Sequence, residues 1–110
     1  MNLVIVALLG LAASTASAAS AQVVAADRGQ RLYASCAGCH GTAGAGSGDR
    51  GDILPVLAGQ PKDVLAASMR AFKTGARPAT VMRQLAKGYT EAQIEQIAAY
   101  LAAQPAVQAK

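Results

Sequence analysis

The hydrophobic positions in the last third of the chain repeat with the period of a helix. One face of this helix carries the apolar side chains Ile94, Ile97, Ala98 and Leu101. Thr90 and Gln93 stand before this face with the spacing of a capping box, and Pro105 follows it. The pattern predicts an amphipathic final helix that begins after Thr90 and ends before Pro105.

The middle of the chain shows the same period over a shorter stretch. Apolar side chains recur at the positions Leu65, Met69 and Phe72. Pro61 suits the first position of a helix, and Gly75 suits the position just after its end. A shorter helical piece is expected over residues 80–86, stopping at Gly88.

A first helix is expected from Asp27 to about Ala37, with Leu32 and Tyr33 facing inward. Gly29 lies within it and indicates a close approach to another helix, which we expect to be the final helix near Tyr100. The glycine-rich stretch 41–52 predicts a flexible surface loop. No alternating β pattern occurs, so the fold class expected is all-α, with about four short helices.

The N-terminal stretch reads as an export signal. An apolar run from Leu3 to Ala13 is followed by Ala16-Ser17-Ala18, which fits the small-x-small pattern of a signal-peptidase site. No Lys or Arg precedes the run, and an uncleaved anchor is the alternative. The strongly apolar part spans about 11 residues, whereas a membrane-spanning helix needs about 20. We therefore expect residues 1–18 to be a cleaved signal, which places the protein in the periplasm.

The remaining chain is expected to hold one domain. Residues 19–26 are assigned as a linker, 27–104 as the domain and 105–110 as a C-terminal tail. A domain of this size buries a small share of its surface, and this sequence of 110 residues has one Phe, three Tyr and no Trp. Its own side chains supply little bulk for a core, so a bulky group in the middle is expected.

Both cysteines and the single histidine of the chain stand within the motif C-A-G-C-H at 36–40. A disulfide between Cys36 and Cys39 would close only a very short loop, which stabilises little. A thioredoxin-type dithiol would need a βαβ context, and a zinc site would need a second pair of ligands. C-x-x-C-H is the attachment motif of c-type haem, and this alternative needs no residue that the chain lacks.

The motif assigns one covalent haem c to the chain. Cys36 and Cys39 are predicted to form its thioether bonds, and His40 to bind the iron. Pro55 is the candidate whose carbonyl oxygen orients the His40 ring, because a ligating imidazole commonly donates its other N–H to a fixed acceptor; the alternative is a simple turn proline. The haem would also supply the missing bulk of the core.

Two methionines remain as candidates for the second axial ligand once Met1 leaves with the signal. Met69 falls at a core position of its helix and is read as a packed side chain. Met82 follows Gly75 and Pro78, which break regular structure, so it is the predicted ligand; the alternative is that it fills a gap on a short helix. Ligation by both His40 and Met82 would leave the iron no open position.

The order helix, "CAGCH", loop, "LPVLAGQ", helix, methionine, helix resembles a class I c-type cytochrome over residues 27–104. The stretches "LAGQP", "AFKTGARPATVMRQLAKGYT" and "IAAYLAAQ" are similar to the cytochrome subunit of flavocytochrome c sulfide dehydrogenase, and more distantly to cytochrome c4-like domains. The resemblance implies the class I cytochrome c fold around one haem. It carries over the roles of Cys36, Cys39, His40, Met82 and Pro55, and the helix crossing of Gly29 with Tyr100.

The resemblance also implies a function. An FAD-containing partner subunit would oxidise sulfide, and this chain would pass the electrons to a downstream cytochrome or oxidase, with no catalytic site of its own. The alternatives are a free soluble cytochrome that carries electrons between respiratory complexes, and a haem peroxidase or small-ligand sensor, which requires that Met82 not bind iron. Some members of the subunit family carry two haem domains, whereas this chain has one motif.

Charge adds a modest expectation about partners. The formal net charge is +4, and basic residues gather around the segment of Met82, namely Arg70, Lys73, Arg77, Arg83 and Lys87. Such a group would steer an acidic partner surface; the alternative is a set of ordinary solvated helix faces. Aromatic residues do not interleave with these charges, which disfavours nucleic acid as a partner.

Overall fold

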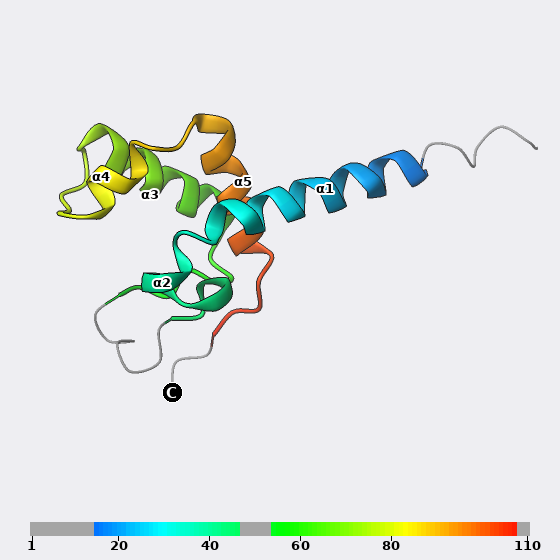
Figure 1. Cartoon of the computed structure of the whole chain (residues 1–110), viewed down its shortest axis with the longest axis horizontal. Coiled ribbons are helices and arrows are strands. Elements are labelled where there is room, and N and C mark those ends of the chain that lie inside the picture. The colour runs from blue at the N-terminus through cyan, green and yellow to red at the C-terminus, as the bar shows by residue number, and fades with distance from the viewer. Residues whose placement is uncertain (1–14, 47–53, 108–110) are drawn as a thin grey trace, which may run out of the picture.

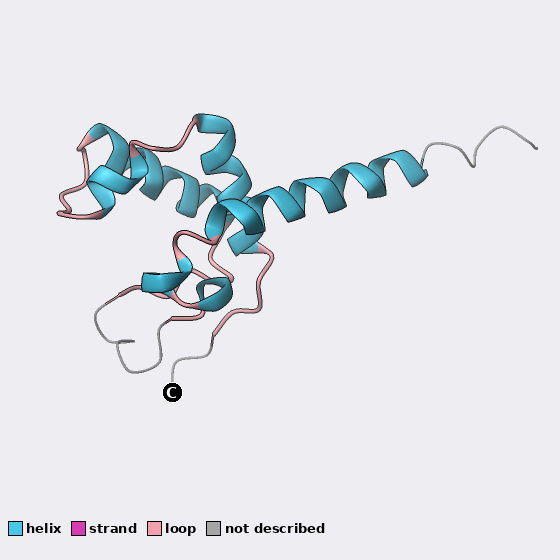
Figure 2. Cartoon of the chain, in the orientation of Figure 1, coloured by secondary structure: helices cyan, strands magenta, loops and turns pink. Residues whose placement is uncertain are grey.

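The computed structural model describes residues 15–46 and 54–107. Within these ranges every regular element is a helix, and no strand occurs (Figure 2). The elements are α1 (Thr15–Tyr33), α2 (Ala37–His40), the 3-10 helix η1 (Thr42–Gly44), α3 (Lys62–Thr74), α4 (Met82–Ala86) and α5 (Glu91–Ala102). The prediction of an all-α fold is confirmed.

The first helix differs from its predicted bounds at both ends. Within the described residues it already runs from Thr15, upstream of the predicted start at Asp27, and it ends at Tyr33 instead of Ala37. The stretch before Asp27 is rich in Ala and has neither Gly nor Pro, so nothing in it stops a helix. Figure 1 shows this N-terminal part of α1 extending away from the other helices. Residues 34–36 form a turn that separates α1 from α2.

Two predictions for the termini fall partly outside the described residues. The predicted signal covers 1–18, of which 1–14 are outside, and the predicted tail covers 105–110, of which 108–110 are outside. The predicted linker, 19–26, is helical as part of α1. No helix in the described part of the chain has the length and apolar character needed to cross a membrane.

Helices α1 and α5 cross in close contact, as Figure 1 shows. A Cβ atom added at Gly29 would lie 2.5 Å from the Gln96 carbonyl oxygen and 2.7 Å from Tyr100 Cβ. The rings of Tyr33 and Tyr100 also pack across this contact, with centroids 5.6 Å apart. The crossing predicted at Gly29 and Tyr100 is therefore confirmed, and it depends on the missing side chain at Gly29.

The apolar face predicted for the final helix forms the centre of the core. Ile94, Ile97, Ala98 and Leu101 are all buried. Tyr33 from α1 and Leu65 and Ala66 from α3 complete the buried cluster, and Leu32 and Met69 pack against it. The capping box is present, with Thr90 Oγ1 accepting from the Gln93 amide and Gln93 Oε1 accepting from the Thr90 amide.

The two helices of the central segment follow the sequence pattern with small shifts. Pro61 stands at the capping position just before α3 and not inside it, and α3 ends at Gly75, whose backbone is left-handed with φ 83°. Helix α4 begins at Met82, later than the predicted residue 80. It packs on α3, and α3 packs on α5.

Charged side chains join α3 to α5 at the surface. Arg70 Nε donates to Glu91 at 2.8 Å and its other nitrogen contacts Glu95, while Lys62 Nζ lies 3.0 Å from Glu95. Hydrogen bonds from Lys62 and then Arg70 lower the pKa of Glu95. These pairs are exposed, so each contributes little to stability.

The segment after the motif departs from the predicted flexible surface loop. Residues 42–44 form η1, and Gly41 and Gly44 are buried. Gly41 has φ 82°, and a Cβ there would overlap the Gly46 carbonyl oxygen, so this turn requires glycine. The rest of the predicted loop, 47–52, lies outside the described residues.

We predict that Gly29→Ala destabilises the protein by about 1–3 kcal/mol, because the new methyl group overlaps the backbone of α5. Helix propensity alone predicts the opposite sign, a gain of about 1 kcal/mol. Denaturant unfolding of the purified protein measures the change. Gly88→Ala is the control, since its Cβ would make an ordinary 3.4 Å contact with the Leu85 carbonyl oxygen. Equal stability of both variants would contradict the close crossing.

Candidate haem-attachment site

The residues of the C-x-x-C-H motif occupy a single turn of helix. The His40 amide donates to the Cys36 carbonyl at 2.9 Å, and the Cys39 amide donates to the same oxygen at 3.1 Å. Side chains three and four positions apart lie on one face of a helix. The structure therefore brings the side chains of Cys36, Cys39 and His40 to the same side of α2.

No disulfide joins Cys36 to Cys39. Cys39 is exposed and Cys36 is half-buried. Burial raises the pKa of the Cys36 thiol, and hydrogen bonds from Ser35 and Tyr89 oppose this rise. The two sulfur atoms are three residues apart on one turn, as thioether bonds to one edge of a porphyrin require.

The His40 ring is held in a fixed orientation. The residue is 7% exposed, and its Nδ1 lies 3.1 Å from the Pro55 carbonyl oxygen. A carbonyl oxygen only accepts, so Nδ1 donates in this contact, and in the neutral ring Nε2 then keeps its lone pair. His40 thus has the tautomer of a metal-binding imidazole, and the structure brings His40 and Pro55 together.

The backbone around His40 is held by contacts from three segments. The Gly46 amide donates to the His40 carbonyl at 2.8 Å, and the Leu57 amide donates to the Gly44 carbonyl at 2.9 Å. The Tyr33 hydroxyl donates to the Gly41 carbonyl at 2.6 Å in a buried contact. Burial raises the pKa of Tyr33 to about 12, with a smaller contribution from Cys36.

The two candidate methionines lie in different surroundings. Met69 in α3 packs against the buried core cluster, as its position in the pattern predicted. Met82 is the first residue of α4, half-buried and outside that cluster. The described contacts therefore join His40 to Pro55 but do not join Met82 to either of them.

Sequence reasoning missed two contacts beside the motif. One is the hydrogen bond from Tyr33 to Gly41, and the other links Ser35 Oγ to the Tyr89 hydroxyl at 2.6 Å. Ser35 and Tyr89 are far apart in the sequence, so no local spacing indicates their contact. The one available indication in the sequence was the scarcity of aromatic residues. With only three tyrosines in the chain, each one was a candidate for a specific contact.

The basic group predicted around Met82 is smaller than the sequence indicated. Arg70 pairs with Glu91 and Glu95, and Lys73 donates to the Tyr89 carbonyl at 2.5 Å. The Arg77 guanidinium lies over the Phe72 ring at 4.8 Å from its centroid. Arg83 and Lys87 are exposed on and just after α4, and the positive surface around this helix therefore rests mainly on these two residues and Arg77.

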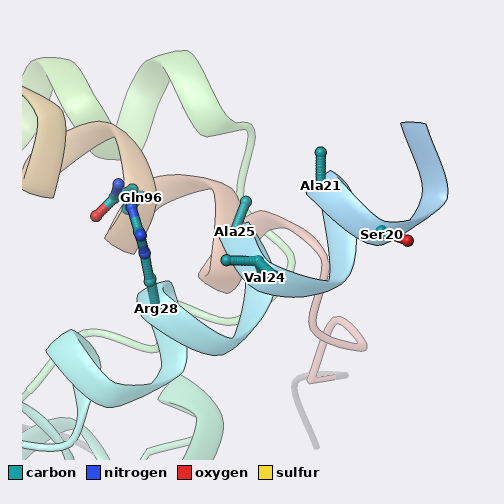
Figure 3. Close-up of a pocket in the computed structure, with 6 residues that line it drawn as sticks. All are labelled: Ser20, Ala21, Val24, Ala25, Arg28 and Gln96. Carbon is teal, nitrogen blue, oxygen red and sulfur yellow. The ribbon is translucent and has the colours of Figure 1, made fainter. Parts of the chain in front are cut away.

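Two surface hollows of the described chain lie away from the motif. One is lined by residues of α1 together with Gln96 of α5 (Figure 3). A second lies between α1 and α5 and reaches Tyr100 and Lys62. Neither is lined by Cys36, Cys39, His40 or Met82, so the candidate chemistry belongs to α2 and its surroundings.

The donor set fits a covalent haem better than a bare metal ion. Three or more His, Cys, Asp or Glu side chains that could together hold a metal ion do not occur among the described residues. Two cysteine side chains and one oriented imidazole on a single turn match the needs of haem attachment. Fold and site together define the class of c-type cytochromes.

The chain belongs to the cytochrome c family, whose model matches residues 26–104. Cytochrome c4 from Acidithiobacillus ferrooxidans has a similar structure, described as supporting a complex-induced tuning of electron transfer. The TM-score is 0.63 at 33% identity, over 71% of this chain and 49% of that one. Reduced recombinant cytochrome c4 from Pseudomonas stutzeri has a TM-score of 0.67 at 25% identity, over 76% and 50% of the two chains.

The chain spans about half the length of these two cytochromes c4. No curated protein matches it in sequence. The family and the similar structures confirm the predicted class I cytochrome c fold. Membership of this family implies covalently bound haem c.

We predict that Tyr33→Phe lowers the free energy of unfolding by about 0.5–1.5 kcal/mol, because it removes the buried hydrogen bond to the Gly41 carbonyl, which then accepts only from the Gly44 amide at 3.1 Å. The stability advantage of the native protein over this variant should disappear as pH rises from 10.0 to about 12. Above 10.0 the unfolded phenol ionises first, while the folded one stays protonated.

Denaturant unfolding at several pH values measures both effects. Tyr100→Phe is the matched control, since the Tyr100 hydroxyl has no hydrogen-bond partner among the described residues. A Tyr33→Phe variant as stable as the Tyr100→Phe variant at pH 7 would contradict the assigned contact.

Proposed function

We propose that this chain is a periplasmic electron carrier in which Cys36 and Cys39 hold one haem c and His40 and Met82 bind its iron. The observation that carries the proposal is the single turn that presents both thiols and His40, with Nδ1 turned to the Pro55 carbonyl. This contact fixes the orientation of the ring and leaves Nε2 to bind the iron. Metal-binding histidines commonly have such a hydrogen-bond acceptor at their other ring nitrogen.

The second axial ligand decides what the iron can do. Bound haem supplies a one-electron Fe(III)/Fe(II) couple, and a methionine ligand raises its potential relative to a second nitrogen ligand. Met82 lies outside the core cluster at the start of α4 and is free to serve as this ligand. With both axial positions taken by protein, the chain transfers electrons and has no catalytic site of its own. An open position would instead favour a peroxidase or a small-ligand sensor.

The partner proposed is the FAD-containing subunit of a sulfide dehydrogenase. Support comes from the stretches "LAGQP", "AFKTGARPATVMRQLAKGYT" and "IAAYLAAQ", which are similar to the cytochrome subunit of flavocytochrome c. The flavin subunit would oxidise sulfide, and this chain would pass electrons singly to a downstream cytochrome or oxidase. The exposed charges of Arg77, Arg83 and Lys87 suit an acidic partner surface.

A free soluble cytochrome that carries electrons between respiratory complexes is the second candidate function. Its support is the structural similarity to cytochrome c4 from two organisms. Both functions need the same iron ligands, so the site alone does not separate them. Both also agree with the export signal proposed for residues 1–18.

We predict that Met82→Ala removes the weak near-infrared absorption band of Met–Fe(III) ligation, because the thioether that binds the iron is lost. Met69→Ala is the matched control and should keep the band, since Met69 packs against the core. Absorption spectra of the oxidised proteins test this. A band that survives in Met82→Ala and disappears in Met69→Ala would reverse the ligand assignment.

We predict that the native periplasmic protein elutes together with a flavoprotein at a mass well above that of the chain alone, which is 11.0 kDa with its signal included. Size-exclusion chromatography with haem and flavin absorbance recorded together measures this, and added sulfide should reduce the haem in the shared fraction. Haem that elutes alone at monomer mass would favour the free soluble cytochrome.

A further inference from the structure

A hydrogen bond joins the haem-attachment turn to the segment that carries Met82. The Tyr89 hydroxyl lies 2.6 Å from Ser35 Oγ, and Ser35 directly precedes Cys36. Tyr89 is also a hydrogen-bond partner of the Cys36 thiol, so both contacts of its hydroxyl reach the attachment turn. We name this contact the Ser35–Tyr89 latch.

Ser35 makes a second contact that ties the latch to α1. Its hydroxyl lies 3.2 Å from the Leu32 carbonyl, which accepts from it. In the latch itself either hydroxyl can donate, because both Ser and Tyr hydroxyls are donors and acceptors. Leu32 belongs to α1, so Tyr89 is tied to the end of α1 as well as to the start of the motif.

Tyr89 is rigidly connected to Met82 through the backbone. The Leu85 amide donates to the Val81 carbonyl at 3.1 Å, the Gly88 amide donates to the Leu85 carbonyl at 3.1 Å, and the Tyr89 amide donates to the Ala86 carbonyl at 3.3 Å. Helical and turn hydrogen bonds thus run without a break from the start of α4 to Tyr89. A hydrogen bond that fixes the position of Tyr89 therefore also restricts the movement of Met82.

Two further contacts keep Tyr89 in place from other sides. Its ring packs against the buried core cluster, and its carbonyl accepts from Lys73 Nζ of α3 at 2.5 Å. The ring and backbone of Tyr89 are therefore anchored to the core and α3. Only the hydroxyl reaches across to the attachment turn, so this one group can be removed while the rest of the residue stays anchored.

We propose that the Ser35–Tyr89 latch holds the Met82 segment closed over the haem and so sets how readily Met82 leaves the iron. The inference rests on the proposed ligand pair His40 and Met82. Tyr89 is then a positioning residue that acts through Met82 and does not touch the iron. Loss of the hydroxyl leaves the ligands in place but lowers the free energy needed to open the segment.

An added ligand measures this opening directly. Imidazole binds ferric haem only where the methionine has left, so its apparent affinity is proportional to the population of the open state. A net hydrogen bond between partly exposed groups corresponds to a roughly two- to fivefold change in an equilibrium. We therefore expect Tyr89→Phe and Ser35→Ala each to bind imidazole roughly two- to fivefold more tightly than the native protein.

The experiment titrates imidazole into the oxidised, haem-loaded proteins and follows loss of the near-infrared Met–Fe(III) band. Tyr100→Phe is the matched control, because it removes a tyrosine hydroxyl outside the latch, and its affinity should equal that of the native protein. The double variant Ser35→Ala/Tyr89→Phe should match Tyr89→Phe, since the second substitution removes no further hydrogen bond of the latch.

The possible outcomes separate the latch from the proposed function. A native protein without the near-infrared band would overturn the ligand pair, and the latch with it. A native protein with the band, together with unchanged imidazole affinity in Tyr89→Phe, would overturn the latch alone, even if the variant unfolded more easily. Additive effects in the double variant would also overturn it, because the two hydroxyls would then act independently.

Discussion

The close crossing of α1 and α5 is the constraint on which the arrangement of the other described segments depends. At Gly29 the backbone of α1 approaches Gln96 and Tyr100 at distances that no side chain at Gly29 would allow. This approach places Tyr33, near the end of α1, within the buried core, and the chain leaves the helix there to form the attachment turn. The position of the motif relative to the core therefore follows from a contact between two helices that lie far apart in the sequence.

The attachment turn is held by backbone acceptors more than by side-chain packing. Pro55 presents its carbonyl to His40, while Gly41 presents its carbonyl to Tyr33 and Gly44 accepts amides of the following segment. Carbonyl oxygens of a fixed turn are good orienting partners, because they accept hydrogen bonds but cannot themselves carry a proton. The small residues around the motif fit the same picture, since they let these segments approach closely.

The basic residues of this protein fall into two groups: those that bind other protein groups and those that remain exposed. Arg70 and Lys62 are used between α3 and α5, where their acidic partners neutralise them, and Lys73 is used to hold Tyr89. Arg77, Arg83 and Lys87 remain exposed, respectively before, within and just after α4. A positive surface near the segment of Met82 matters for an electron carrier, because charge complementarity speeds and orients encounter with a partner. The net charge of the sequence does not distinguish paired from exposed basic residues, since it counts both alike.

The sequence by itself determined the class of the protein, because C-x-x-C-H and helical periodicity are local patterns. The buried face of α5, its capping box and the end of α3 at Gly75 all follow from residues within a few positions of one another. The predicted start of α1 at Asp27 was wrong. The Ala-rich stretch before Asp27 contains no residue that ends a helix, so the helix runs through it. Only the tertiary structure decided which basic residues are paired, that the turn after His40 is buried, and that Tyr89 reaches Ser35. Those features depend on distances between segments remote in the chain, and such distances are set by packing of the whole core.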